Sequence, residues 1–567
     1  MQKNSFISSS NDKTSVSFIK KIRDIFYKMK KTIDEEIIGD RDIFYKIFSD
    51  IKIQISLVFL AGIITRIYFT PFELPITLDG AQYFWYAVDT SILGEFPKEY
   101  NFPNNGWPLF LSIIFNITSP DTFLDFFIAQ RLTSIIFSAA TIIPIFLLCK
   151  RFFDVKIAIL GACIFIFEPR LLINSISGLP ESIFIFLFTF SIYLFLSQKF
   201  KMIYVSFGLV ALLSLIRYEG ILLIFPFFIL LFFKFNEHKK NIPKYFLALS
   251  IFILILLPIM SLRVEATGSD GIFSHIIPQT TFYQSDPVTN ANFDTEDNFV
   301  TKISKGITNM VKLTGWITIP YLFFFIPGGI ILFFKNFNRN RRIIFIFSII
   351  MLIPAFYAFS RDFSEMKYLF IIVPIFILIS LSFIEYILRK TKKENLIICL
   401  LIIGVIFASI VFLEYKKIDY EHEIEAYQIG IKISEITNVI NDYDPESKYV
   451  DEKIVETTIL DEFPILFSNV PDQIIVIQGA NGGEIIGCDS CYEAKSLNEF
   501  LNNARNDDLE YLLVDDNPKR PEFIKEIREK ESEYPFLEKI YDSRNDGFTY
   551  HVKIFKIDYE KFDNLTK

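Results

Sequence analysis

Long apolar segments separated by short polar stretches dominate the hydrophobic pattern of the chain. A helix that crosses a bilayer needs about 17 to 25 mostly apolar residues, and eleven segments meet or approach this length. They lie at residues 51–70, 122–149, 155–174, 180–197, 202–216, 220–234, 244–262, 313–334, 342–360, 367–388 and 394–414. The pattern therefore predicts a polytopic α-helical membrane protein with about eleven transmembrane helices.

Two segments beside the first predicted spans have a different character. Residues 1–50 are polar and include the basic stretch KKIRDIFYKMKK, which is not the pattern of a signal peptide. We interpret them as a cytoplasmic, partly amphipathic segment that lies against lipid headgroups. Residues 107–118 form an apolar run too short to span the bilayer, so we interpret it as interfacial.

Basic residues in the short loops predict the orientation in the membrane. If the N-terminus is cytoplasmic, each of the five loops on that side carries Lys or Arg. The first loop on the other side, residues 71–106, contains five carboxylates and a single lysine, Lys98. The predicted outer loops are then residues 71–121 and 263–312, and eleven crossings place everything after Glu421 outside the cell.

Composition supports a membrane protein and shows that the C-terminal region differs from the rest of the chain. Hydrophobic residues make up 51% of the chain, and 65 residues are Phe. Both values are higher than is usual for a soluble globular protein. Residues 421–567 instead carry 33 acidic and 16 basic residues, a net charge of −17. Such an acidic exterior region argues against nucleic acid as a partner.

Residues 421–567 alternate between strand-like and helix-like segments. QIIVIQGA, EYLLVDD and YHVKIFKIDY have the pattern of short strands, and SLNEFLNNARND and RPEFIKEIREKESEYPFLEKI have that of helices. This alternation predicts a small extracytoplasmic α/β domain, compatible with a Rossmann-like sandwich. Cys488 and Cys491, in the sequence CDSC, are candidates for a disulfide, with free thiols or half of a metal site as alternatives.

Ionisable residues gather at the ends of spans that are predicted to face outward. They are Arg66, Arg131, Glu168, Arg170, Glu181, Arg217, Glu219, Arg361 and Lys367. Ionisable groups at membrane depth usually face a cavity or one another, so this one-sided set predicts a polar cavity open to the exterior. The alternative is that they are interfacial anchors and structural ion pairs.

The segment LDGAQYFWYA places Asp79 among aromatic residues in the first outer loop. In a helix, Tyr83 and Tyr86 share a face with Asp79 and are suited to stack on a sugar. A carboxylate there is suited to deprotonate a hydroxyl or amide, or to hold a divalent cation such as Mg²⁺ or Mn²⁺. Nearby cations, Lys367 and Arg217 above all, would bind the phosphate of a leaving group. Tyr368 would pack against the headgroup.

The ordered motifs of the chain resemble the GT-C superfamily of integral-membrane glycosyltransferases, which includes protein O-mannosyltransferases, aminoarabinose transferases and oligosaccharyltransferase catalytic subunits. The resemblance covers about residues 51–390. Its motifs are TRIYF, LDGAQYFWYA, NFPNNGWPLFLSIIF, AQRLTSIIFSAATIIPIFLLCKRFF, EPRLLINSISGLPESIFIFLF, LSLIRYEGILLIFPFFILLF and MKYLFIIVPIFILI. It implies that the acidic residue Asp79 is catalytic. The family often has a second acid beside it, whereas Gly80 follows here and leaves a metal requirement open.

The resemblance also implies the reaction. An inverting glycosyltransferase would move a sugar from a polyprenyl phosphate, dolichyl or undecaprenyl, to a lipid, glycan or protein acceptor on the extracytoplasmic face. An oligosaccharyltransferase subunit is one alternative, but a motif like WWDYG is missing after the last tryptophan, Trp316. A lipid-glycan flippase or transporter is the other, and the inverted repeats typical of transporters are not evident in the sequence.

Overall fold

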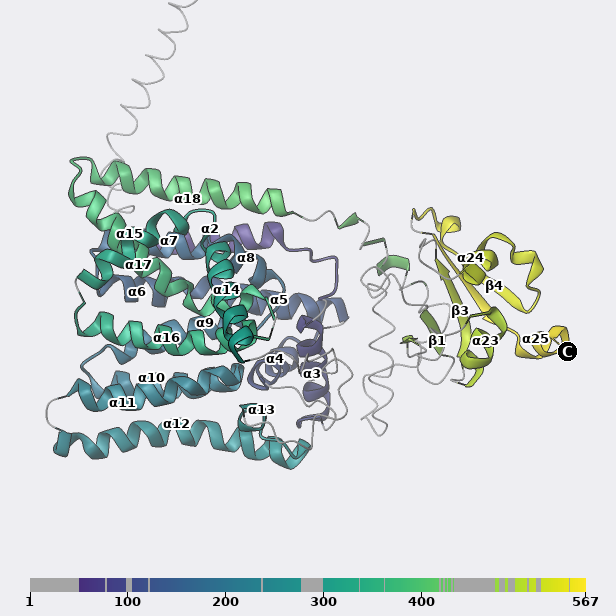
Figure 1. The fold of residues 1–567 in the computed structure, drawn as a ribbon, viewed down its shortest axis with the longest axis horizontal. Coiled ribbons are helices and arrows are strands. Elements are labelled where there is room, and N and C mark those ends of the chain that lie inside the picture. The colour runs from purple at the N-terminus through teal and green to yellow at the C-terminus, as the bar shows by residue number, and fades with distance from the viewer. Residues whose placement is uncertain are drawn as a thin grey trace, which may run out of the picture. The chain divides into compact units, whose positions relative to one another are not determined.

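A computed structural model gives the structure of the protein (Figure 1). It describes residues 50–76, 79–97, 104–120, 123–235, 238–276, 299–335, 337–361 and 363–417, several residues between 420 and 432, and residues 475–478, 485–487, 495–506, 509–515, 522–549 and 551–566. The chain divides into two compact units, Met1–Ala61 and Gly62–Lys567. In the first unit, the described residues form the start of helix α2 (Ile51–Phe69).

Helices account for nearly all of the described chain up to residue 417. They are α3 (Asp79–Leu93), α4 (Gly106–Thr118), α5 (Phe123–Ala140), α6 (Ile142–Lys150), α7 (Val155–Ile166), α8 (Pro169–Ile176), α9 (Glu181–Phe195), α10 (Phe200–Ile216), η1 (Tyr218–Leu223), α11 (Ile224–Lys234), α12 (His238–Thr267), α13 (Phe273–Ile276), α14 (Phe299–Thr318), α15 (Leu322–Lys335), α16 (Arg339–Phe359), η2 (Met366–Ile372), α17 (Val373–Arg389) and α18 (Glu394–Lys416). In Figure 1, the axes of α10, α11, α12 and α16 lie roughly parallel to one another.

Length and hydropathy identify the spanning helices. Within the described residues, six helices are long and apolar enough to cross a membrane, and eight if each of two bent pairs forms one span. Helices α4, α9 and α10 are apolar but shorter. The protein is therefore a multi-pass membrane protein, and the predicted count of eleven spans stays a prediction.

The predicted span at residues 313–334 is not one straight helix. Helix α14 ends at Thr318, α15 begins at Leu322, and the two are bent by 113° at this break. Pro320 lies in the break; it has no backbone N–H to donate and disfavours helical backbone at the residue before it. Hydropathy alone joins the two helices because both flanks of the break are apolar.

Side-chain caps and aromatic packing shape the helical part. Asp154 caps α7 by accepting a hydrogen bond from the backbone N–H of Ile157 at 3.0 Å. In the core, the rings of Phe195, Phe227 and Phe347 pack with centroids 4.5–5.5 Å apart and join α9, α11 and α16. Three predicted span cysteines are free thiols: Cys149 and Cys163 are buried, whereas Cys399 is exposed.

The C-terminal region contains a five-stranded sheet. Its strands are β1 (Ile475–Gln478), β2 (Ile485–Gly487), β3 (Leu509–Asp515), β4 (Leu537–Asp542) and β5 (Val552–Ile557), in the order β2-β1-β3-β5-β4. Helices α23 (Leu497–Asn506), α24 (Glu522–Glu529) and α25 (Tyr559–Thr566) accompany it. Phe500 from α23, Ile524 from α24 and Phe562 from α25 join Leu512 and Phe555 in one buried cluster.

The pairing of these strands corrects the Rossmann-like interpretation. All four strand pairs are antiparallel, whereas a Rossmann-like sandwich has a mainly parallel sheet. The strand-like segments of the sequence contain β1, β5 and all of β3 except Leu509, whereas the predicted helix RPEFIKEIREKESEYPFLEKI is wrong at its end, where Leu537 begins strand β4. Alternation of strands and helices along a chain does not by itself fix strand direction, because a connecting helix can also join antiparallel neighbours.

Buried His551 makes the stability of this sheet depend on pH. Its Nδ1 lies 3.1 Å from Nη2 of Arg528, and its Nε2 lies 3.1 Å from Oδ1 of Asp542. The guanidinium only donates, so this Nδ1 accepts and the ring is the neutral Nε2–H tautomer. Burial lowers the pKa of His551, and Arg544 lowers it further against the opposing effect of Asp542.

We predict that acidification weakens the sheet. Because the pKa of His551 is lower in the folded state, the unfolded chain binds the proton first, and stability is lost as the pH falls below about 6.5. Hydrogen exchange of β5 in the full chain should therefore speed up between about pH 7.5 and pH 5.5, after correction for the intrinsic rate. His551→Gln should flatten this dependence; an equally steep dependence in that variant would contradict the assignment to His551.

Candidate active site

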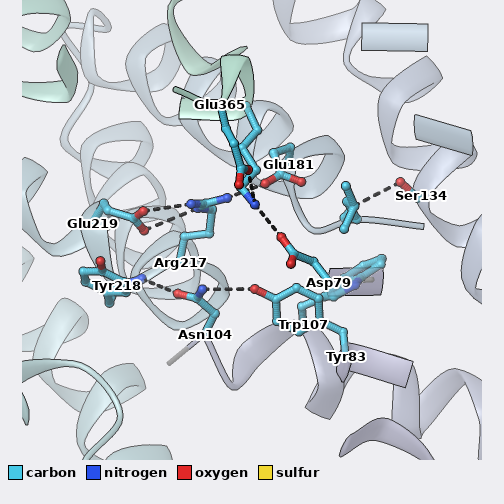
Figure 2. A network of polar contacts seen from close by, with 12 residues as sticks. Asp79, Tyr83, Asn104, Trp107, Ser134, Glu181, Arg217, Tyr218, Glu219 and Glu365 are labelled. Carbon is cyan, nitrogen blue, oxygen red and sulfur yellow. Dashed lines mark hydrogen bonds and ion pairs between the residues drawn. The ribbon is translucent and has the colours of Figure 1, made fainter. Parts of the chain in front are cut away.

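Asp79 begins helix α3, and its carboxylate accepts a hydrogen bond from the ammonium of Lys367 at the start of η2 (Figure 2). Lys367 also lies 2.5 Å from the carboxylate of Glu365. About half of the Asp79 side chain is exposed, as is about half of that of Glu365, whereas Lys367 is mostly buried. The fold thus brings together two residues 288 positions apart, and leaves a carboxylate accessible beside a cation.

Close packing fixes the residue after Asp79 as glycine. A Cβ at Gly80 would lie 2.3 Å from Cγ2 of Ile76 and 2.9 Å from the carbonyl oxygen of Ser177. The carbonyl of Gly80 accepts a hydrogen bond from the side chain of Gln130 at 3.0 Å, and the same amide donates to the carbonyl of Gly178 at 2.9 Å. The start of α3 is therefore held against the loop that precedes α9, and a larger residue at position 80 would displace Asp79.

Arg217 lies next to this pair and is bound by two buried carboxylates. Its guanidinium donates to Glu219 from two nitrogens, at 2.8 and 3.4 Å, and to Glu181 at the start of α9. Figure 2 shows Glu219, Arg217 and Glu181 in a row that ends near Glu365. All three side chains of this ion-paired group are less than a tenth exposed. Arg217 sits between α10 and η1 with an extended backbone, and Glu219 in η1 is one of its two partners.

A small cavity connects the two ion-paired groups. Its lining residues are Glu181, Phe184, Ile185, Arg217, Glu219, Met351, Pro354, Lys367, Tyr368 and Ile371. The guanidinium of Arg217 lies 5.8 Å from the ring centroid of Tyr368. Around this cavity, each of two cations contacts two carboxylates. An anion bound by either cation would therefore have to displace a carboxylate, and the half-exposed Asp79 and Glu365 are easier to displace than the buried Glu181 and Glu219.

Asn104 joins α3 to the Arg217 segment. Its Nδ2 donates to the hydroxyl of Tyr83 at 3.2 Å, and its Oδ1 accepts from the backbone N–H of Tyr218 at 2.9 Å (Figure 2). Asn104 has a positive φ of 72°, in the left-handed region where non-glycine residues are uncommon. Burial raises the pKa of Tyr83 to about 12. Tyr83 therefore stays a neutral phenol.

Tyr86 belongs to a separate buried group. Its hydroxyl donates to Oδ1 of Asn105 at 3.2 Å and accepts from the fully buried Arg263 of α12 at 2.9 Å. Trp107 donates from Nε1 to the carbonyl of Gly178 at 3.2 Å. These contacts hold α3 and α4 to the rest of the helical part and leave Tyr86 fully buried, and its stacking on a sugar stays a prediction.

Two predicted substrate-binding arginines bond to the protein itself. Arg66 is fully buried and donates to the hydroxyls of Ser138 and Ser175 at 2.9 and 3.1 Å and to two backbone carbonyls. Arg131 donates to the carbonyls of Pro71, Leu74 and Pro75. Arg131 thereby anchors the segment that leads into Asp79, so both residues are placed as supports of the site.

Glu168, Arg170 and Arg361 also make contacts apart from the Asp79–Lys367 pair. Glu168 is the N-cap of α8 and accepts from the backbone N–H groups of Arg170 and Leu171 at 2.7 and 2.9 Å. Arg170 donates to the carbonyl of Ile319, and the guanidinium of Arg361 stacks on Tyr357 at 4.3 Å. Cys488 and Cys491 lie outside the described residues, so the disulfide stays a prediction.

Several site residues escaped prediction from the sequence. Asn104, Asn105 and Gln130 are neutral amides, whereas the predicted site consists of ionisable and aromatic residues. Arg263 lies beyond the predicted end of its span, and Glu365 lies before the start of the next predicted span. The doubled asparagine in NFPNN was the available signal, because Asn tolerates a left-handed backbone better than most residues.

A family model and several solved structures resemble this chain. The family model described as dolichyl-phosphate-mannose-protein mannosyltransferase matches residues 108–261, from α4 into α12. That segment contains Glu181, Arg217 and Glu219 but not Asp79 or Lys367. No curated protein matches the chain.

Solved structures extend the likeness over most of the chain. The apo oligosaccharyltransferase of Archaeoglobus fulgidus has a TM-score of 0.53 at 13% identity, covering 82% of this chain and 70% of that one. The chain has the GT-C glycosyltransferase fold. The AglB oligosaccharyltransferase of the same organism, in complex with an inhibitory peptide and a dolichol-phosphate, gives 0.50 at 12%, covering 82% and 69%. ArnT from Cupriavidus metallidurans bound to undecaprenyl phosphate gives 0.48 at 10%, covering 88% and 97%.

The resemblance to the GT-C superfamily predicted from the motifs is thereby confirmed. One of the Archaeoglobus fulgidus structures is a complex with Zn and sulfate. In the chain described here, the residues around Asp79 do not fit a divalent cation. The ammonium of Lys367 occupies an oxygen of Asp79, and position 80 has no room for a second carboxylate. Within the described residues, three or more His, Cys, Asp or Glu side chains do not gather into a metal-binding group.

Proposed function

We propose that the protein is an inverting glycosyltransferase that moves a sugar from a polyprenyl phosphate to a hydroxyl or amide of a lipid, glycan or protein acceptor. The observation that carries the proposal is the contact between the half-exposed Asp79 carboxylate and Lys367 at the edge of a small polar cavity. This contact places a proton acceptor beside a phosphate-binding cation, as transfer from a phosphate carrier requires. The GT-C fold supports the same reaction class.

The reaction assigns one role to each group. Asp79 takes the proton of the acceptor as the acceptor atom forms its bond to the anomeric carbon. The bond from that carbon to the phosphate oxygen breaks, and its electron pair leaves with the polyprenyl phosphate. Lys367 binds the phosphate and offsets the charge that develops on it. Because Asp79 is half exposed, its proton then passes to water.

Transfer by the purified full-length protein tests this proposal. In nanodiscs it should convert a synthetic polyprenyl-phosphate sugar into polyprenyl phosphate and a glycosylated acceptor, and should leave nucleotide sugars unused. A set of donors that differ in the sugar, offered with an extract of membrane lipids and glycoproteins as acceptors, would identify the substrates by mass spectrometry. Movement of intact donor across a vesicle membrane without cleavage of the sugar–phosphate bond would instead support a flippase.

Lys367 and Glu365 give a pair of opposite predictions for donor binding. Lys367→Met should weaken binding of the donor by about tenfold, because a hydrogen bond to a charged group is lost. Glu365→Gln should strengthen it, by roughly threefold, because Lys367 loses a competing carboxylate. Titration of a fluorescent polyprenyl phosphate in nanodiscs measures both. Equal donor affinity in the two variants would contradict the assignment of Lys367 as the residue that binds the phosphate.

The proposal also places the site outside the cell, with eleven spans, a cytoplasmic N-terminus and an extracytoplasmic C-terminal domain. The support is the basic character of the five loops predicted to be inside. Single cysteines replacing Glu95, Lys240 and Asn545, in a chain without the native five, test this arrangement. An impermeant thiol reagent should label positions 95 and 545 in intact cells and position 240 only after lysis. Labelling at 240 in intact cells, or protection at 545, would overturn it.

A further inference from the structure

Helix α14 lies across the end of a spanning helix rather than along it. It is bent by 113° from α15 (Figure 1). Its middle packs on the last turn of α16: the side chain of Asn309 donates to the carbonyl of Phe359 at 3.1 Å, and a Cβ at Gly306 would lie 2.9 Å from the ring of Phe356. Helix α16 ends at Phe359, so α14 crosses it at one boundary of the membrane.

This boundary is the one at which the candidate active site lies. Helix α14 contacts η2 as well as α16. Lys367, which binds Asp79, belongs to the first turn of η2. The opposite end of α16 begins with the basic residues Arg339, Arg341 and Arg342. The position of α14 at the Asp79 side therefore follows from its contacts and does not depend on which side of the membrane that is.

The surface of α14 divides into three faces. Gly306, Leu313 and Ile317 are buried and face the protein. Val300, Ile307 and Val311 are 75%, 54% and 68% exposed, and spacings of seven and four residues align them on one side of the helix. An exposed aliphatic stripe on a helix that crosses the end of a span fits the acyl chains of the adjoining leaflet.

The third face is basic. Lys302 and Lys312 are exposed, and at 3.6 residues per turn they lie about 200° and 120° around the helix from Val300, measured in the same sense. The sequence of α14 contains no Asp or Glu. Trp316, half exposed near its C-terminal end, is of the residue type enriched at membrane interfaces. An aliphatic face on one side and lysines on the other is the pattern of a helix that lies in the interface and meets anionic headgroups.

We propose that α14 is an interfacial helix whose Lys302 and Lys312 bind the phosphate groups of anionic phospholipids beside the candidate active site. The aliphatic stripe enters the acyl chains, and the lysines reach up to the phosphates. The ligand is the bulk lipid of the leaflet, so this role of α14 does not rest on the proposed enzymatic activity.

Two measurements on the full chain in nanodiscs test the placement and the lipid. Nitroxide labels at Ile307, Thr308 and, for reference, Ile349 in the middle of α16 report depth through their accessibility to oxygen and to a water-soluble nickel chelate. The label at 308 should lie at headgroup level, that at 307 just below, and that at 349 in the bilayer core. Equal depth at 308 and 349, or a fully aqueous position 307, would overturn the interfacial placement.

A photoreactive residue at Thr308 identifies the lipid. In equimolar phosphatidylglycerol and phosphatidylcholine it should crosslink mainly phosphatidylglycerol. Each of Lys302→Gln and Lys312→Gln should lower that preference by about fivefold, because one basic residue near an anionic surface contributes about 1 kcal/mol. Lys392→Gln with Lys393→Gln, at exposed positions between α17 and α18, is the matched control and should leave the ratio unchanged. A ratio of one, or a ratio that the α14 variants do not alter, would overturn the proposal.

Discussion

Replacing Asp79 by Asn should lower the rate of sugar transfer by about 100-fold or more, with little change in expression and without loss of donor binding. Asn is close to Asp in size, and Lys367 keeps its second partner, Glu365, so the local packing stays in place. The amide, however, does not accept a proton from the acceptor, and a positioned general base contributes on the order of 100- to 10,000-fold. Single-turnover transfer from a saturating polyprenyl-phosphate donor measures the loss.

Glu365→Gln is the matched control for this prediction. Both changes remove one carboxylate from the same ammonium, and both residues are about half exposed. If Asp79 served only to balance the charge of Lys367, the two variants would lose activity alike. We expect Glu365→Gln to keep transfer within a few-fold of the native rate. Near-native transfer in Asp79→Asn would contradict the base role and direct attention to Asp89 or Glu95.

The sequence identified individual residues of the site better than the contacts between them. Asp79 was identified from an acidic, aromatic loop, and Lys367 from its place at the start of a span, and the structure joins the two directly. Hydropathy could suggest that both lie at the same membrane boundary, but not that they touch, because the register between distant helices depends on packing. Asn104 was missed for a related reason: its role arises from one backbone conformation between two segments 114 residues apart.

The charged residues show the same limit of prediction from sequence. Arg66 and Arg131 were predicted to line a polar cavity, yet their guanidinium groups bond to hydroxyls and carbonyls of the protein. An arginine that lines a cavity and an arginine that bonds to the protein's own backbone look alike in the sequence, because each is a charged residue next to an apolar segment. The break between α14 and α15 did have a signal, Pro320, but apolar residues on both sides of it concealed the change of direction.

The ion pairs of Arg217 differ from those of Lys367 in burial, and this difference separates their roles. Arg217, Glu181 and Glu219 are each less than a tenth exposed, and the carboxylates hold three guanidinium nitrogens. A donor phosphate would have to remove a buried carboxylate to reach Arg217. We therefore infer that Arg217 orders the cavity wall and fixes η1, while Lys367 meets the phosphate.

Replacing Arg217 by Met should accordingly destabilise the protein by about 3–5 kcal/mol, because two buried carboxylates lose their common partner. Reversible unfolding in a mixed detergent would measure this loss. Adding Glu181→Gln and Glu219→Gln to Arg217→Met should recover most of the stability, since amides do not carry the unpaired charge. If Arg217 instead served the donor phosphate, Arg217→Met would leave the free energy of unfolding unchanged and weaken only donor binding, and the two glutamine changes would not rescue it.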